Sequence, residues 1–106
     1  MIQNGYFDVD YLEWIKTITQ VDIGNTVTSI GDYAFSDCTS LTNVTIGNGV
    51  TSIGNYAFYG CRGLMSVTIP NRVSTIKGGA FANCENLTSV TIGSGIQGIG
   101  GYAFTT

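Results

Sequence analysis

Three cysteines, Cys38, Cys61 and Cys84, are the residues of this chain whose chemistry could bind a metal or attack a substrate. They stand 23 residues apart, and the chain contains neither histidine nor a Cys-x-x-Cys pair. Zinc and iron–sulfur sites need ligands at short spacings. We therefore interpret the cysteines as a column of buried thiols, with a disulfide between neighbours as the rarer alternative. The sequence predicts no metal and no other cofactor.

Catalytic constellations are absent from the sequence. The lack of histidine removes the usual general base and the Ser-His-Asp and Cys-His arrangements. Aspartate and glutamate are scattered, so a glycosidase-like carboxylate pair has no evident place. Residues 93–98 match the phosphate-binding pattern G-x-G-x-x-G, but a second strand, not a helix, is expected to follow them. We predict that the chain is not an enzyme.

Repetition with a period of 23 residues positions all of these residues. Eight apolar columns share this period, and a single unit buries too little to offset its ordering entropy, so units must stack. A hairpin meander is the rival interpretation, but its loops would tolerate varied lengths. The clearest columns are Val27, Val50, Val73 and Ile96; Ile30, Ile53, Ile76 and Ile99; Ala34, Ala57, Ala80 and Ala103; and Phe35, Phe58, Phe81 and Phe104.

Each unit is expected to form two short strands and one tight turn. In residues 41–46, L-T-N-V-T-I, alternation points Val44 and Ile46 inward. A glycine-rich turn and a second β-branched stretch follow at 47–53. Residues 56–61 lack β-branched side chains and predict a helical or 3₁₀ turn. The fold class is therefore a mostly β leucine-rich-repeat solenoid of about four stacked 23-residue coils.

The unit from Leu41 to Cys61, with its I-G-N-Y-A-F-Y-G-C ending, resembles the BspA-like bacterial leucine-rich repeats over about residues 18–104. The resemblance implies a non-catalytic protein-binding module of the adhesin type, as in large secreted or surface-anchored proteins of host-associated microbes. The alternatives are a small free-standing intracellular effector or inhibitor, a phage-borne one included, and a self-assembling structural stack.

Binding residues are expected on the outward side of the longer strands, the predicted concave face. Small hydroxyl and amide side chains line it, although threonine also suits any exposed strand position. The third unit departs from the pattern at Met65 and Pro70, and its basic residues predict a local positive patch. The concave-face residues are Asn43, Thr45, Ser66, Thr68, Ser89 and Thr91, and the patch residues are Arg62, Arg72 and Lys77.

The two ends of the repeat array differ from its middle. Residues 1–17 are interpreted as a degenerate N-terminal cap, and residues 18–106 as a solenoid truncated at its C-terminus. The last unit lacks a polar cap, which predicts an open edge and a homodimer formed through it. That edge comprises Ile92, Ile96, Ile99, Tyr102 and Phe104.

Composition narrows the range of partners. A net charge of -3 argues against nucleic acid, and no apolar run is long enough for membrane insertion. The predicted partner is another protein. The first residues lack the basic and apolar regions of a signal peptide. This predicts a cytoplasmic location if the chain is complete, and the cell surface if it is a fragment of a longer protein.

Overall fold

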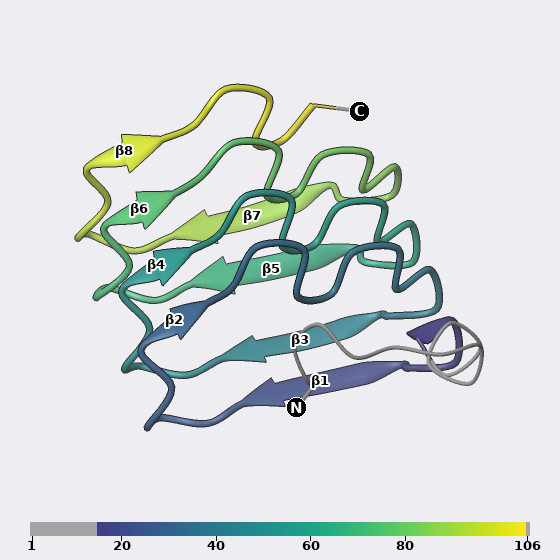
Figure 1. Cartoon of the computed structure of the whole chain (residues 1–106), viewed down its shortest axis with the longest axis horizontal. Helices are drawn as coiled ribbons and strands as arrows, with labels where there is room; N and C mark the ends of the chain where they lie inside the picture. Colours follow the sequence, from purple (N-terminus) through teal and green to yellow (C-terminus); the bar gives the residue numbers. More distant parts are fainter. Residues whose placement is uncertain (1–14, 106) are drawn as a thin grey trace.

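The computed structural model describes residues 15–105, which form a stack of short parallel strands (Figure 1). Each 23-residue coil contributes one four-residue strand and one two-residue strand. The first coil holds β1 and β2, the second β3 and β4, the third β5 and β6, and the fourth β7 and β8. They follow one another up the stack, from β1 at the bottom of the view to β8 at the top. The strands are β1 (Gln20–Ile23), β2 (Ser29–Ile30), β3 (Asn43–Ile46), β4 (Ser52–Ile53), β5 (Ser66–Ile69), β6 (Thr75–Ile76), β7 (Ser89–Ile92) and β8 (Gly98–Ile99).

Strand pairing confirms the predicted solenoid and its period. Every pair is parallel and joins residues 23 positions apart, as Val21 with Val44 in β1–β3 and Val67 with Val90 in β5–β7. The short strands form one continuous sheet in the order β2-β4-β6-β8. The long strands instead form two separate sheets, β1-β3 and β5-β7. The long-strand side is therefore interrupted between the second and third coils.

Alternation along the long strands places the core on their inner side. In β3, Val44 and Ile46 are buried, whereas Asn43 and Thr45 are exposed. This pattern repeats in β1 and β5, because successive side chains of a strand point to opposite faces. The predicted orientation of both sides is thus confirmed in these strands.

An aromatic stack fills the middle of the core. Phe58 is fully buried and lies between Phe35 and Phe81, with ring centroids at 5.3 and 5.1 Å. Phe104 extends the stack from Phe81 at 5.3 Å. Because each ring contacts only the rings of adjacent coils, the stack couples each coil to its neighbours.

The tight turns are built from two interleaved sets of hydrogen bonds. In the second coil, the amides of Ala57, Tyr59 and Cys61 donate to the carbonyl oxygen three residues earlier. The intervening amides of Tyr56 and Phe58 donate to carbonyl oxygens of the third coil, at 3.0 and 2.7 Å. The expected 3₁₀ geometry is therefore limited to isolated turns, because every other amide is used to join the coils.

Of the predicted N-terminal cap, residues 1–14 lie outside the described residues. Ile15 is buried and belongs to the core cluster of the stack. Within residues 15–105, no helix is long and apolar enough to cross a membrane.

Candidate functional site

The outward side chains of β1, β3, β5 and β7 form a surface that we call the long-strand face. All six residues predicted for the concave face are exposed here, on β3, β5 and β7: Asn43, Thr45, Ser66, Thr68, Ser89 and Thr91. Backbone pairing holds these strands in register, so the small side chains form ordered rows across each paired sheet. Their role in partner binding remains a prediction.

A groove of about 430 Å³ opens on the long-strand face along β3, β5 and the turns that follow them, and reaches Thr91 of β7 and Gly93 after it. Its volume lies within the range of ordinary ligand sites, roughly 300–1,000 Å³. None of its lining residues carries a charge: Val44, Thr45, Ile46, Asn48, Thr68, Ile69, Pro70, Asn71, Thr91 and Gly93. Three predicted threonines line the groove, but the sequence did not indicate the contribution of Asn48, Asn71 or Gly93. Two departures from the repeat could have located the groove: Arg72, which stands where the neighbouring coils have glycine, and Pro70.

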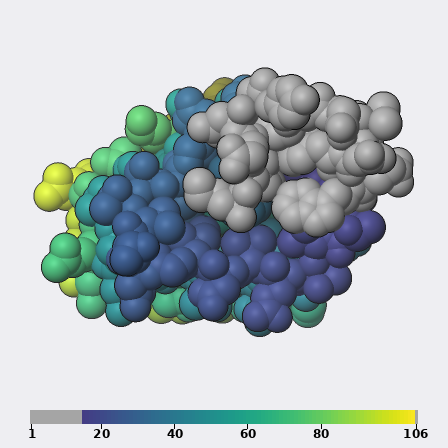
Figure 2. Space-filling model, turned by 60° about the horizontal axis from the view of Figure 1, so that its bottom comes forward, coloured from purple at the N-terminus to yellow at the C-terminus, as the bar shows by residue number. Residues whose placement is uncertain are grey.

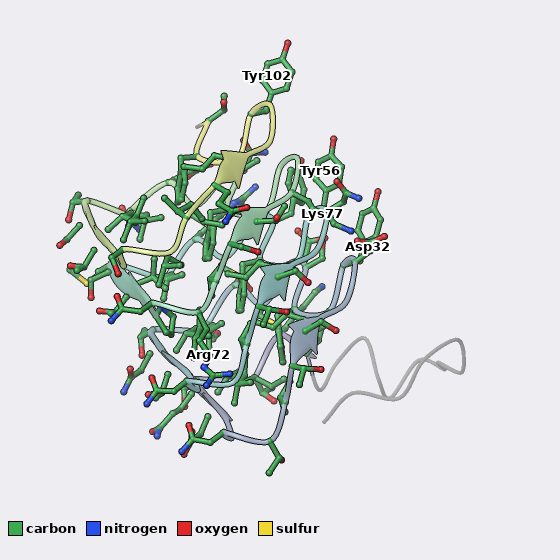
Figure 3. The ribbon with its side chains drawn as sticks, turned by 90° about the vertical axis from the view of Figure 1, so that its left-hand side faces the viewer. Asp32, Tyr56, Arg72, Lys77 and Tyr102 are labelled. Atoms are coloured by element: carbon green, nitrogen blue, oxygen red, sulfur yellow. The ribbon has the colours of Figure 1, made fainter. Side chains whose placement is uncertain are left out.

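The three predicted basic residues are distributed around the third coil. Arg62 forms an exposed ion pair with Glu85, with Nε and Oε2 at 3.7 Å. Arg72 lies before β6 and Lys77 directly after it, and Figure 3 shows them on separate parts of the molecule. The structure does not bring Arg72 and Lys77 together, and their contribution to partner binding stays a prediction.

Tyrosines form a second exposed row, on the turn side. Tyr33, Tyr56 and Tyr102 have left-handed backbones, with φ of 60°, 56° and 61°. For a non-glycine residue this conformation costs roughly 1–2 kcal/mol. Tyr33 and Tyr56 stack at 5.3 Å, whereas the third coil has Gly79, whose added Cβ would lie 2.3 Å from the Tyr56 ring. Figure 3 shows Tyr56 and Tyr102 projecting from the turns at different levels of the stack.

The cysteine column is buried, and all three thiols are free. The thiol of Cys61 donates to the carbonyl oxygen of Phe35 at 3.3 Å, and that of Cys84 to Phe58 at 3.2 Å. Hydrogen bonding with Cys38, then with Cys84, together with burial, raises the pKa of the Cys61 thiol. A protonated, enclosed thiol is a poor nucleophile. Within the described part of the chain, no group of three or more His, Cys, Asp or Glu side chains could hold a metal ion.

The last described coil presents the predicted self-association edge. Ile92 and Ile99 are 39% and 48% exposed, whereas their counterparts in the third coil, Ile69 and Ile76, are almost completely buried. Tyr102 is also exposed, and Ile96 and Phe104 are partly buried against the core. At the opposite end, Figure 2 looks onto the purple and blue first coils. The structure thus gathers the predicted edge residues at one end of the stack.

Residues 93–97 form the turn between β7 and β8, and Gly98 begins β8. A strand follows the glycines, as the sequence indicated, so this segment lacks the helix that a dinucleotide-binding loop requires.

Comparison with known proteins agrees with this geometry. The model of the BspA type leucine-rich repeat region matches residues 8–106, with six copies of the repeat. No curated protein matches the chain. A leucine-rich repeat protein from Bacteroides ovatus ATCC 8483 has a solved structure with a TM-score of 0.81 and 29% identity, covering 85% of this chain. The match spans only 23% of that protein.

A second similar structure is that of a leucine rich cell surface protein from Faecalibacterium prausnitzii A2-165, at 28% identity and a TM-score of 0.49. The match covers 82% of this chain and 36% of that protein. The family match spans nearly the whole chain and the strand pairing repeats its period. The chain therefore belongs to the BspA type leucine-rich repeat family.

Proposed function

We propose that the chain is a non-catalytic protein-binding module of the adhesin type, which contacts its partner through the long-strand face. The observation that carries the proposal is the set of exposed, uncharged side chains on β3 and on the paired strands β5 and β7. Small hydroxyl and amide groups offer both donors and acceptors to a partner. The burial of all three thiols supports a role without covalent chemistry.

Changing Thr45, Thr68 and Thr91 together to lysine is expected to abolish partner capture, because three long charged side chains would then cover the face. Capture is measured by crosslinking the tagged chain in lysate of its native cell and quantifying the bound proteins by mass spectrometry. The matched control places the same three charges at Thr28, Ser29 and Gln97, which are exposed outside the long-strand face. Equal capture by both triple variants would rule out this face as the binding site.

The same experiment separates the alternative functions. Recovery of one defined intracellular complex would favour an effector or inhibitor over an adhesin. Recovery of the chain alone would leave adhesion and self-assembly standing.

Self-association is a second candidate function, and the exposed isoleucines at the edge of β7 and β8 favour it. An isoleucine side chain gains about 1.5–3 kcal/mol when it is fully buried. The equivalent isoleucines of the third coil, Ile69 and Ile76, are buried because the fourth coil covers them. A second copy of the chain packed on this edge would cover Ile92 and Ile99 in the same way.

The expected result is a light-scattering mass of two chains at high concentration, falling to one chain when Ile92 and Ile99 are changed to lysine. Thr28 and Ser29 changed to lysine provide the control for added charge. A monomeric mass for the unaltered chain at high concentration would contradict the dimer.

A further inference from the structure

The joint between the second and third coils lacks hydrogen bonds that the other joints make. At the start of the long strands, the amide of Thr42 donates to Thr19 and that of Thr88 to Met65, both at 3.0 Å. The corresponding bond from the Met65 amide to the Thr42 carbonyl is missing from the described part of the chain. The series of backbone hydrogen bonds that joins neighbouring long strands is therefore interrupted between β3 and β5.

The turns after these strands show the same interruption. The amide of Asn48 donates to Asn25 Oδ1 at 3.0 Å, and that of Ser94 to Asn71 Oδ1 at 2.9 Å. Between these two joints, the Asn71 amide and Asn48 Oδ1 form no such bond in the part of the chain that the structure describes. The two residues that carry this donor and this acceptor, Asn71 and Asn48, both line the groove.

Arg72 explains why the coils separate at this joint. Its counterparts are Gly49 and Gly95, where an added Cβ would lie 2.2 Å from the Asn25 carbonyl oxygen and 2.0 Å from that of Asn71. Real Cβ atoms do not approach backbone so closely, and Arg72 carries one. The turn of the third coil must therefore stay farther from the turn of the second.

Pro70 acts in the same direction. Its counterpart in the fourth coil is Gly93, whose amide donates to the carbonyl oxygen of Ile69 at 2.8 Å. Proline has no amide hydrogen, so it cannot make that bond to the second coil. Pro70 therefore removes one bond that this joint could otherwise make, in addition to the steric effect of Arg72.

The opposite side of this joint remains closed. β4 pairs with β6, and the amide of Ser74 donates to Thr51 at 2.9 Å. The turn amide of Phe58 donates to Ala80 at 2.7 Å. The separation is thus confined to the long-strand side, where it forms a groove with a closed back.

We propose that this groove is a subsite for a short, uncharged, extended peptide segment of the partner protein; this assignment rests on the proposed protein-binding function. A peptide group carries one donor and one acceptor, and can satisfy both Asn48 Oδ1 and the Asn71 amide. The hydroxyls of Thr45, Thr68 and Thr91 offer further bonds along the lining. The absence of charge from that lining favours a neutral segment.

The experiment selects capped, uncharged heptapeptides from a random library on the 106-residue chain. The best peptide is then titrated against variants and followed by the NMR shifts of backbone amides. We expect shifts at Asn71 and Ser94, and a loss of affinity of about tenfold or more when Pro70 and Arg72 are both changed to glycine. That change restores the glycines of the other coils and is expected to close the groove.

Two further variants separate geometry from charge and from misfolding. Thr68→Phe fills the groove from an exposed position and is expected to lose binding, whereas Ser29→Phe, exposed on β2 outside the groove, is the matched control. Arg72→Ala keeps the Cβ but removes the charge, and is expected to keep binding within about twofold. Loss of binding in Arg72→Ala would assign the effect to charge and overturn the proposal.

The outcomes also distinguish the subsite from the proposed function. A selected peptide that binds the Pro70→Gly/Arg72→Gly variant as tightly as the unaltered chain would overturn the subsite and leave protein binding standing. A neutral oligosaccharide that binds with the expected dependence on the variants, in place of any peptide, would overturn the peptide assignment. Failure to select any peptide would also overturn the subsite, while partner capture by the long-strand face would test the wider function separately.

Discussion

Replacing Phe58 with alanine is expected to lower the free energy of unfolding by about 3–5 kcal/mol, the usual cost of deleting a buried aromatic ring. Phe58 is fully buried and is stacked on both sides, by Phe35 and Phe81. Its loss leaves a cavity at the centre of the stack. A domain of this size has a total stability of only about 5–15 kcal/mol, so much of the population would unfold.

Urea denaturation followed by circular dichroism measures this change, and Phe104→Ala is the matched control. Phe104 has one stacked neighbour, Phe81, and is only partly buried. Its removal should cost roughly half as much, because less apolar area and one fewer ring contact are lost. Equal losses in the two variants would show that the aromatic stack does not couple the coils as described.

Replacing Gly49 with alanine is expected to destabilise the chain by about 1–3 kcal/mol, the usual range for forcing atoms into a packed site. The new Cβ would lie 2.2 Å from the carbonyl oxygen of Asn25 and 3.1 Å from that of Val27. Both atoms belong to the backbone of the preceding coil, so the two turns must move apart.

Gly24→Ala is the control, because an added Cβ there meets nothing within 4 Å. It should change the unfolding free energy by no more than about 0.5 kcal/mol. Denaturation midpoints of the two variants, measured side by side, provide the comparison. A neutral Gly49→Ala variant would mean that the turns have freedom to separate, and would weaken the explanation of the joint at Arg72.

The order of the fold could be predicted from residue type and spacing. The columns headed by Val27 and Ile30 fixed the period, and the alternation around Val44 and Ile46 fixed which side of the strand is buried. Both are local properties of the sequence, because a strand has a side-chain period of two and a stack repeats its unit. The outward position of Thr45, Thr68 and Thr91 follows from the same rule.

The detailed geometry of the turns could not be predicted from sequence patterns. Residues 56–61 lack β-branched side chains, which predicted a helical or 3₁₀ turn. In the structure, alternate amides join the next coil, and Tyr56 is held in a left-handed conformation. Neither feature follows from helix propensity, because both depend on the carbonyl oxygens of another coil.

By itself the sequence determined the coil length, the strands, the core columns and the exposure of the hydroxyl row. It also marked Pro70 and Arg72 as departures from the repeat. Only the tertiary structure decided that these departures open one side of one joint, and that Arg72 and Lys77 lie on separate parts of the molecule. The reason is that a repeat pattern specifies which residues are neighbours, whereas the closeness of two coils depends on individual Cβ–carbonyl distances and amide hydrogens between them.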